Sequence, residues 1–147
     1  MDIEIGEMGK PSIPGFNDFS ISHSENSWAV LIADGYGSAH YCGLDIQYTK
    51  NADVNKLAKR WFHADEAAVV ESRGSEAFFR IWARREALVK AVGTSIVNAH
   101  LPSTLTDEVE FEDEVWQLRD IEIPNMNGAF AAVCAKEISE IKVIELD

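Results

Sequence analysis

The segment from Phe78 to Val92, FFRIWARREALVKAV, contains neither Gly nor Pro and lies between Arg73-Gly74-Ser75 and Gly93. Ser75 can act as an N-cap and Gly93 can end a helix, so the pattern predicts a helix of about four turns. An amphipathic helix of this length must bury one face against a second element. The rest of the chain is therefore expected to pack around it.

Spacings of three and four residues place Phe79, Trp82, Glu86 and Lys90 along one stripe of this predicted helix. A Glu–Lys pair at this spacing is most simply a solvated surface pair, worth roughly 0.2–0.5 kcal/mol. Its aromatic neighbours favour a functional site instead, because a charged pair held against aromatic rings requires a metal, a ligand or water to offset desolvation. The helix alone leaves both interpretations open.

The length of 147 residues fits a single domain, which we expect to span residues 1–147. Cys42 and Cys134 lie in apolar runs without CxxC spacing, which indicates buried thiols in a reducing compartment. The N-terminus is acidic and has no long apolar core, and no run reaches the length of a membrane span. We therefore expect a cytoplasmic protein that does not enter a membrane.

The net charge of −12 argues against a nucleic-acid surface, because phosphate binding requires a basic footprint. The charge is unevenly distributed along the chain. Residues 50–90 contain nine Lys and Arg against six Asp and Glu, a local charge of +3. This window could attract an anionic ligand or an acidic protein. It could equally be a pair of ordinary charged helices.

The segments before the helix have the alternation of strands. Phe19–Ser24 is predicted to be a short strand that presents Ser22 and His23 at its end, and residues 28–33 form a predicted buried strand. Residues 34–37 have turn composition, so residues 39–47 are expected to return as the second strand of an antiparallel hairpin.

Within residues 39–47, Gly43, Asp45 and Gln47 share one face of the predicted strand. A metal or a phosphate can approach an acid that lies beside a glycine in mid-strand. The same pattern also fits an exposed edge strand. The segment by itself does not distinguish the two.

Two short helices are predicted before the long one, from a cap at Asn51 or Asp53 through Trp61 and over residues 65–71. After Gly93 the period changes to that of strands. Two half-buried strands are expected within residues 108–123, a buried strand over 129–135 and an edge strand over 142–146. Strands, then helices, then strands predict an α+β fold.

Four segments of the sequence, in this order and spacing, resemble the 4′-phosphopantetheinyl transferases: Gly9-Lys10-Pro11, Phe19–Ser24, Gly43–Gln47 and Trp82–Lys90. The resemblance is to the larger class, the surfactin-synthetase-activating transferases, and covers nearly the whole chain. It implies an antiparallel sheet packed against a long helix. It also implies that the chain is one half of the usual pseudo-dimer plus the end of the other, lacking most of the N-terminal half.

The resemblance implies transfer of the phosphopantetheine arm of coenzyme A to a serine of an acyl or peptidyl carrier protein, the reaction of a holo-acyl-carrier-protein synthase. Asp45 and Glu86 match the acids that hold Mg²⁺ on the coenzyme's pyrophosphate. Magnesium commonly binds one or two carboxylates together with phosphate oxygens and water. Lys90 matches a lysine proposed to deprotonate the serine or to neutralise the transition state.

Further residues are assigned by the resemblance alone. Ser22 and His23 match contacts to the coenzyme's phosphates, Lys10 matches a residue near the adenosine 3′-phosphate, and Arg85 occupies the position of a lysine and could bind a phosphate. Glu66 falls near a family acid.

The chain departs from the family pattern at Gln47, which replaces a second strand acid found in many members. We expect it to be at most a weak metal ligand.

Since an implied half is missing, the resemblance predicts a homo-oligomer, either a dimer or a trimer. The alternative is a vestigial or non-catalytic homologue that binds coenzyme A or a carrier protein. A third possibility, an unrelated α+β enzyme that uses Asp45 and Glu86 for acid–base chemistry, would leave the other motifs unexplained.

Overall fold

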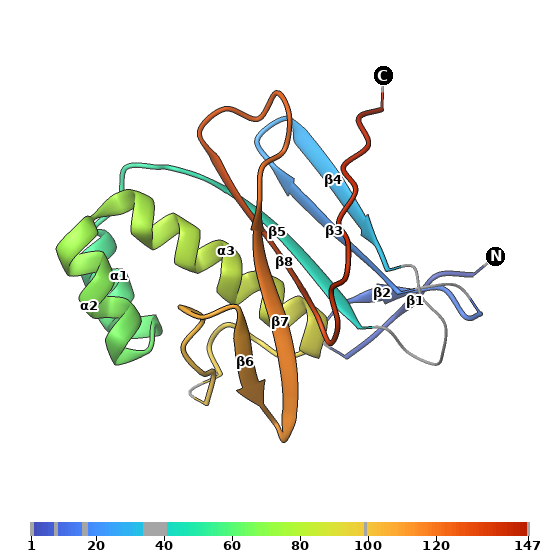
Figure 1. Cartoon of the computed structure of the whole chain (residues 1–147), viewed down its shortest axis with the longest axis horizontal. Helices are drawn as coiled ribbons and strands as arrows, with labels where there is room; N and C mark the ends of the chain where they lie inside the picture. The colour runs from blue at the N-terminus through green and yellow to red at the C-terminus, as the bar shows by residue number, and fades with distance from the viewer. Residues whose placement is uncertain (1, 8, 16–17, 34–40, 99, 147) are drawn as a thin grey trace.

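The computed structural model of the chain describes residues 2–7, 9–15, 18–33, 41–98 and 100–146 (Figure 1). It combines antiparallel strands with helices, which is the α+β class predicted from the sequence. The described residues contain the helices α1 (Val54–Trp61), α2 (Ala64–Arg73) and α3 (Ser75–Val92). None of these helices has the length and hydropathy needed to cross a membrane.

The largest sheet has the strand order β5 (Cys42–Tyr48), β8 (Ala129–Ala135), β7 (Glu114–Ile121) and β6 (Glu108–Phe111), and every neighbouring pair is antiparallel. The strands predicted over residues 129–135 and within 108–123 are confirmed. Glu112 and Asp113, both with positive φ, form the turn between β6 and β7. In Figure 1, α3 crosses this sheet and packs against β5, β8 and β7.

Helix α3 ends where the sequence predicts, at Gly93, which adopts the left-handed conformation with φ 82°. It begins at Ser75, so its N-cap is Gly74 rather than Ser75. The helix side that faces the sheet consists mainly of small residues, because Ala83, Ala87 and Ala91 are buried there together with Leu88. Small side chains allow the backbones of a helix and a sheet to lie close together.

The closest approach of α3 to the sheet is at Gly43 of β5. A Cβ atom built on Gly43 would lie 1.9 Å from the carbonyl oxygen of Ala87 and 2.7 Å from the backbone nitrogen of Ala91. Real side chains do not tolerate such distances, so only glycine fits here. The glycine in the Gly-x-Asp pattern thus sets the distance between β5 and α3.

Helices α1 and α2 pack against the first turns of α3. Asp53 caps α1 by accepting a hydrogen bond from the backbone nitrogen of Lys56 at 3.2 Å, as one of the two predicted caps. Phe78 and Phe79 of α3 lie in a second apolar core with Ala58 and Val70. This core holds the start of α3, while the alanine-rich side holds its second half on the sheet.

A separate two-stranded sheet is formed by β3 (Phe19–Ser24) and β4 (Ser27–Ile32), which pair antiparallel. It lies beside β5, and two serine side chains make the connection. The hydroxyl of Ser20 accepts from the backbone nitrogen of Leu44, and that of Ser22 from the nitrogen of Ile46, both at 3.0 Å. A further short pair, β1 (Glu4–Ile5) and β2 (Pro11–Ser12), precedes it.

Three predictions about strands are wrong. The hairpin expected between residues 28–33 and 39–47 does not form, because β4 pairs with β3 across a two-residue connection whose first residue, Glu25, has a φ of 54°. A tight turn of this kind favours pairing of the strands that flank it. The turn expected at residues 34–37 lies outside the described residues.

The strand over residues 28–33 was expected to be buried, but Trp28, Val30 and Ile32 are exposed. A two-stranded sheet leaves one face uncovered unless another element packs on it. The edge strand expected over 142–146 is absent from the described residues, since no neighbouring strand offers backbone partners to this segment.

We predict that Gly43→Ala destabilises the protein by at least about 1–3 kcal/mol, because the added methyl group collides with the backbone of α3 and the helix must move away from β5. Urea unfolding measures the change. Gly6→Ala is the matched control, because a Cβ there would meet its nearest atom at an ordinary 3.5 Å. Equal unfolding midpoints for the two variants would contradict this account of the helix–sheet contact.

Candidate functional site

Asp45 lies in mid-strand on the face of β5 that is turned toward α3, and only 5% of it is exposed. Its carboxylate accepts from Lys90 Nζ at 2.9 Å and from Gln47 Nε2 at 2.7 Å, and the Ser22 hydroxyl lies at 3.5 Å. Burial raises the pKa of Asp45, although the charge of Lys90 and these hydrogen bonds oppose the rise. Asp45, the mid-strand acid near Gly43 that the sequence singles out, thus lies in a buried, polar cluster.

Glu86 lies on α3 one turn before Lys90, and the charge of Asp45 acts on its carboxyl group as well. Burial raises the pKa of Glu86 to about 7, and the negative charge of Asp45 adds to the rise. The positive charge of Lys90 acts in the opposite direction. The strand carboxylate of Asp45 therefore lies close enough to the helix carboxyl group of Glu86 to disfavour its ionisation.

Lys90 joins three segments of the chain through its ammonium group. Nζ donates to the carbonyl oxygen of Leu44 at 2.9 Å, to Asp45 Oδ1 at 2.9 Å and more weakly to the carbonyl oxygen of Ile21 at 3.4 Å. An ammonium group has three donors and no acceptor. Lys90 is thus held as a fixed cation between β3, β5 and α3.

The serines of β3 form one wall of this cluster. Ser22, which the resemblance assigned to phosphate contact, is buried and lies beside Asp45. Ser20, which sequence reasoning missed, makes the equivalent bond two residues earlier. The alternation Phe19-Ser-Ile-Ser was the available signal, since buried serines at i and i+2 require acceptors or donors on a neighbouring segment. The backbone carbonyl groups that bind Lys90 had no signal in the sequence.

The structure does not bring Lys10 to Asp45. Its ammonium group forms an ion pair with Asp18 at 2.7 Å and donates to the carbonyl oxygen of Cys42 at 2.9 Å. Asp18 also accepts from the backbone nitrogen of Cys42 at 2.6 Å. Lys10 therefore lies at the start of β5 and ties the preceding segments to it, with 21% of its side chain exposed.

His23 also lies apart from the cluster. Neighbouring residues of a strand point to opposite faces, and His23 is exposed whereas Ser22 is buried. Its ring stacks on that of Trp28 in the paired strand, with ring centres 4.6 Å apart. Ser22 and His23 thus lie on opposite faces of the β3–β4 hairpin.

Arg85 points away from the cluster and into the interior beneath α1 and α2. One of its terminal nitrogens donates to Glu66 Oε1 at 2.6 Å and the other to the carbonyl oxygen of Trp61 at 3.0 Å. Glu66 is fully buried and also accepts from the backbone nitrogen and hydroxyl of Thr104. This guanidinium is occupied in linking α3 to α2 and the segment after α3, and the structure does not offer it to a phosphate beside Asp45.

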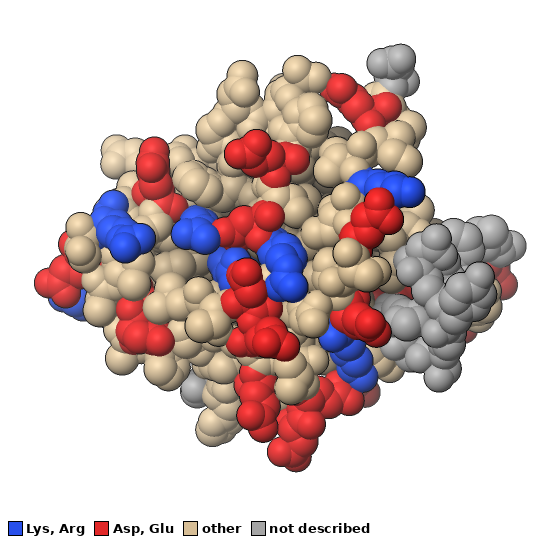
Figure 2. Space-filling model, in the orientation of Figure 1, with Lys and Arg blue, Asp and Glu red and all other residues tan. Residues whose placement is uncertain are grey.

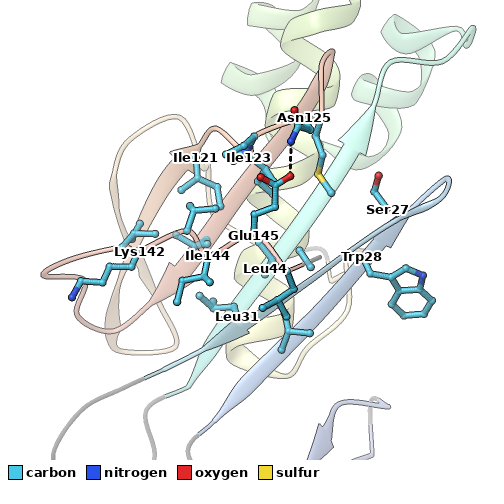
Figure 3. A pocket seen from close by; sticks show the side chains of 18 residues that line it. Ser27, Trp28, Leu31, Leu44, Ile121, Ile123, Asn125, Lys142, Ile144 and Glu145 are labelled. Carbon is cyan, nitrogen blue, oxygen red and sulfur yellow. Dashed lines mark hydrogen bonds between the residues drawn. The ribbon is translucent and has the colours of Figure 1, made fainter.

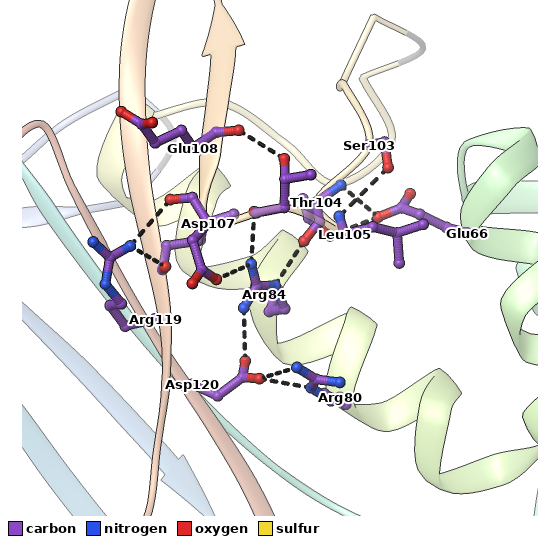
Figure 4. Close-up of polar contacts among 12 residues, drawn as sticks. Glu66, Arg80, Arg84, Ser103, Thr104, Leu105, Asp107, Glu108, Arg119 and Asp120 are labelled. Atoms are coloured by element: carbon purple, nitrogen blue, oxygen red, sulfur yellow. Dashed lines mark hydrogen bonds and ion pairs between the residues drawn. The ribbon is translucent and has the colours of Figure 1, made fainter.

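A second arginine, which sequence reasoning did not single out, holds the other flank of α3. Figure 4 shows Arg84 bound to the Thr104 carbonyl oxygen at 2.6 Å and to Asp120 of β7 at 2.9 Å. Arg80, one turn earlier, forms an ion pair with the same Asp120. Only 3% of the Arg84 side chain is exposed. Arginines on both sides of α3 thus fix the rotation at which Glu86 and Lys90 face β5.

The donor set at Asp45 and Glu86 fits a magnesium ion held jointly with a substrate. Among the described residues no group of three or more His, Cys, Asp and Glu could hold a metal without help. Magnesium commonly binds through one or two carboxylates and takes its remaining ligands from phosphate and water. A divalent cation here would also favour the ionised form of Glu86, whose pKa is raised by burial and by the charge of Asp45.

We predict that Arg85→Met costs about 3–5 kcal/mol of stability, because it leaves the Glu66 carboxylate buried without its ion-pair partner. Urea unfolding gives the value. Arg80→Met is the matched control on the same helix. Because 56% of the Arg80 side chain is exposed, its loss should cost no more than about 1 kcal/mol. A cost for Arg85→Met as small as that of the control would show that the buried pair is not needed.

The raised pKa of Glu86 predicts how the free energy of unfolding changes with pH in buffer without divalent ions. Its pKa is 4.5 when unfolded and about 7 when folded, so the folded state favours the protonated form. Stability from this group is present below pH 4.5 and is lost as the pH rises through 7. We expect Glu86→Gln to match the wild type at pH 4.5 and to be more stable by on the order of 1–3 kcal/mol at pH 8.

Thermal unfolding at the two pH values makes this test. Glu76→Gln, an exposed position in the first turn of α3, is the control and should show no such pH-dependent gain. If Glu86→Gln and the wild type differ equally at both pH values, burial and the charge of Asp45 do not raise the pKa of Glu86 as described.

Comparison with known proteins agrees with this geometry. Residues 41–137, which include Asp45, Glu86 and Lys90, match the 4′-phosphopantetheinyl transferase superfamily. The 4′-phosphopantetheinyl transferase AcpT of Salmonella typhi is 35% identical over 113 residues, which are 69% of this chain and 57% of that protein. HetI of Nostoc sp., with the same activity in its name, is 30% identical over 126 residues, 80% of this chain and 51% of that protein.

A third relative, the 4′-phosphopantetheinyl transferase psf-1 of Bacillus pumilus, is 36% identical over 95 residues, 60% of this chain and 38% of that protein. The alignments thus span about half the length of the first two relatives. The family match itself covers well over half of this chain. Because this segment matches the family and contains Asp45, Glu86 and Lys90, the chain belongs to the 4′-phosphopantetheinyl transferase superfamily.

Proposed function

We propose that this protein transfers the 4′-phosphopantetheine group of coenzyme A to a serine of an acyl or peptidyl carrier protein in a magnesium-dependent reaction. The observation that carries the proposal is the convergence of Asp45, Glu86 and Lys90 at the β5–α3 contact, within the segment that matches the family. The serine oxygen would form a bond to the phosphorus that bears pantetheine. The bond from that phosphorus to the bridging oxygen would break, with adenosine 3′,5′-bisphosphate as leaving group, and the serine proton would pass to solvent.

Asp45 and Glu86 would hold the magnesium ion, which neutralises charge on the pyrophosphate. Lys90 would add a fixed positive charge at the same place, since three oxygen atoms already orient its ammonium group. Of the two roles considered for Lys90, these contacts favour charge neutralisation over deprotonation of the serine. A lysine that acted as a base would need a free lone pair.

The other contacts to coenzyme A belong to the same proposal. Ser22 would lie nearest to the metal, because its hydroxyl is already beside Asp45. Lys10 and His23 would meet parts of the long coenzyme that extend away from the metal. Gln47 would act through its carbonyl oxygen or a water molecule, while its amide nitrogen stays on Asp45. Arg85 is not part of this set, because its partner is Glu66.

The surface charge bears on the carrier partner. Figure 2 shows acidic side chains gathered at the lower end of the view, where the β6–β7 turn lies, and basic side chains set among acids over α3. An acidic carrier protein would be repelled by the first region. We therefore expect it to approach from the side of residues 50–90.

The larger transferase class, a homo-oligomer and a cytoplasmic location complete the proposal. The class is supported by relatives that extend well beyond the aligned segment, of which the alignment covers 57%, 51% and 38%. A reducing compartment is supported by Cys42 and Cys134, which are both buried and free.

The test is the gain of one phosphopantetheine mass by an apo carrier protein when this protein, coenzyme A and Mg²⁺ are present, measured by mass spectrometry. EDTA, Asp45→Asn and Glu86→Gln should abolish the gain, and Lys90→Ala should slow it by about 10²–10³-fold. Lys142→Ala, whose side chain is 75% exposed, is the control and should keep the wild-type rate. Binding of coenzyme A without any labelling would instead identify a non-catalytic binding protein.

A further inference from the structure

The contact between β3 and β5 follows a regular pattern. Three side chains on the β3 side each accept a hydrogen bond from the backbone nitrogen that lies 24 positions later in the chain. These pairs, which we call rungs, are Asp18 with Cys42, Ser20 with Leu44 and Ser22 with Ile46. The constant offset means that β3 and β5 run side by side in the same direction. The even-numbered residues of β5 turn their backbone groups to β3, and the odd-numbered ones turn theirs to β8.

The next rung of this pattern is open. With the same offset Ser24, the last residue of β3, belongs opposite Tyr48, the last residue of β5. Ser24 is half-buried and lies on the same face of β3 as Ser22. Within the described part of the chain, no hydrogen bond is formed by the Ser24 hydroxyl, the Tyr48 backbone nitrogen or the carbonyl oxygen of Ile46 on the same edge. We call these three unused groups the fork.

The space beside the fork is open. Figure 3 shows the tip of the hairpin, which carries Ser27, diverging from the end of β5, and the same divergence is visible in Figure 1. Ser27 and Leu44 of β5 both line a groove of about 590 Å³, so the space between the tip and β5 is hollow. The opposite end of the β3–β5 contact is closed, because Lys10 and Asp18 bind the backbone of Cys42 there. A ligand can therefore lie between the two strands at the fork.

We propose that the fork binds the phosphopantetheine arm of coenzyme A, through the hydroxyl group and the first amide of the arm. The inference rests on the proposed function, in which Asp45 and Glu86 hold the pyrophosphate through magnesium. Ser22, in the last closed rung, lies 3.5 Å from the Asp45 carboxylate, and Ile46 follows Asp45 directly in β5. The arm begins at the pyrophosphate, so its first polar groups would lie next to the fork.

The groups of the fork match an amide and a hydroxyl better than a phosphate. The Tyr48 N–H requires an acceptor, the Ile46 carbonyl requires a donor, and the Ser24 hydroxyl can act as either. A secondary amide supplies one donor and one acceptor, and the adjacent hydroxyl of the arm can pair with Ser24. Phosphate oxygens are acceptors, so they would be repelled by the Ile46 carbonyl and by the exposed carboxylate of Glu25 beside Ser24.

The length of the open edge argues against a protein strand as the occupant. Strand β5 ends at Tyr48, and the Ser22 rung already covers the backbone nitrogen of Ile46. One rung is therefore open at this end of β5. Strand addition gains its affinity from a series of main-chain hydrogen bonds. A single amide of the coenzyme needs only one rung.

The binding of two ligands in the presence of Mg²⁺, measured by isothermal titration calorimetry, tests the proposal. One ligand is coenzyme A, and the other is adenosine 3′-phosphate 5′-diphosphate, which is coenzyme A without the arm. Ser24→Ala should weaken the binding of coenzyme A by about 3–10-fold, as expected for one lost hydrogen bond, and should leave the binding of the nucleotide unchanged. The urea unfolding midpoint should not change, because the Ser24 hydroxyl bonds to none of the described residues.

Ser20→Ala is the matched control, on the same strand and the same face but in a closed rung. It should lower the unfolding midpoint and leave the ratio of the two affinities as in the wild type. Hydrogen exchange followed by NMR tests the backbone part of the fork. The amide of Tyr48 should be protected when coenzyme A binds, and it should not be protected when the nucleotide without the arm binds.

Equal weakening of both ligands by Ser24→Ala would place Ser24 at the phosphates, and this result or no weakening at all would overturn the proposal. Protection of the Tyr48 amide by a carrier protein but not by coenzyme A would overturn it as well. Carrier labelling by the wild type, with coenzyme A binding unaffected in Ser24→Ala, would contradict this inference alone. The expected binding without labelling would contradict the transferase alone, and a wild type that does not bind coenzyme A would contradict both.

Discussion

The contact between Gly43 and the backbone of α3 is the constraint on which the candidate site depends. A helix normally stands off a sheet by the length of its side chains, but here the alanines of α3 and the missing side chain of Gly43 let the two backbones touch. Asp45 lies two residues further along β5, on the same face. The short helix–sheet distance is what places this carboxylate against Lys90 and within the field of Glu86.

The charges at the β5–α3 contact are not fully paired. Lys90 compensates one carboxylate, but two approach it, and burial penalises both. By contrast, each arginine that fixes α3 has a carboxylate partner, Glu66 for Arg85 and Asp120 for Arg84, although Arg85 Nε is buried without a hydrogen-bond partner. The same helix thus combines ion-paired structural charges on two sides with an excess of negative charge on the third. Such an excess favours a bound cation.

Features that depend on side-chain periodicity were predicted correctly from the sequence. The pairing of the strands was not. Helix α3, the strand over 129–135 and the shared face of Gly43 and Asp45 follow from side-chain spacing. The pairing of β4 with β3 depends on the short connection at Glu25 instead. The resemblance assigned Arg85 to a phosphate, whereas the structure pairs it with Glu66. Periodicity could not indicate this ion pair, because the two residues lie on different helices and are distant in sequence.

The link between β3 and β5 has a mechanical consequence. Two serine hydroxyl groups join these strands in place of a ladder of main-chain bonds. Parting them breaks these two hydrogen bonds and the two weaker ones from Lys90 Nζ to the carbonyl oxygen of Ile21 and from Ser22 to Asp45, each at a net cost of about 0.5–1.5 kcal/mol. Neither sheet has to unravel for this seam to widen beside Asp45, so a bulky reactant can gain room there by a rigid swing of the hairpin.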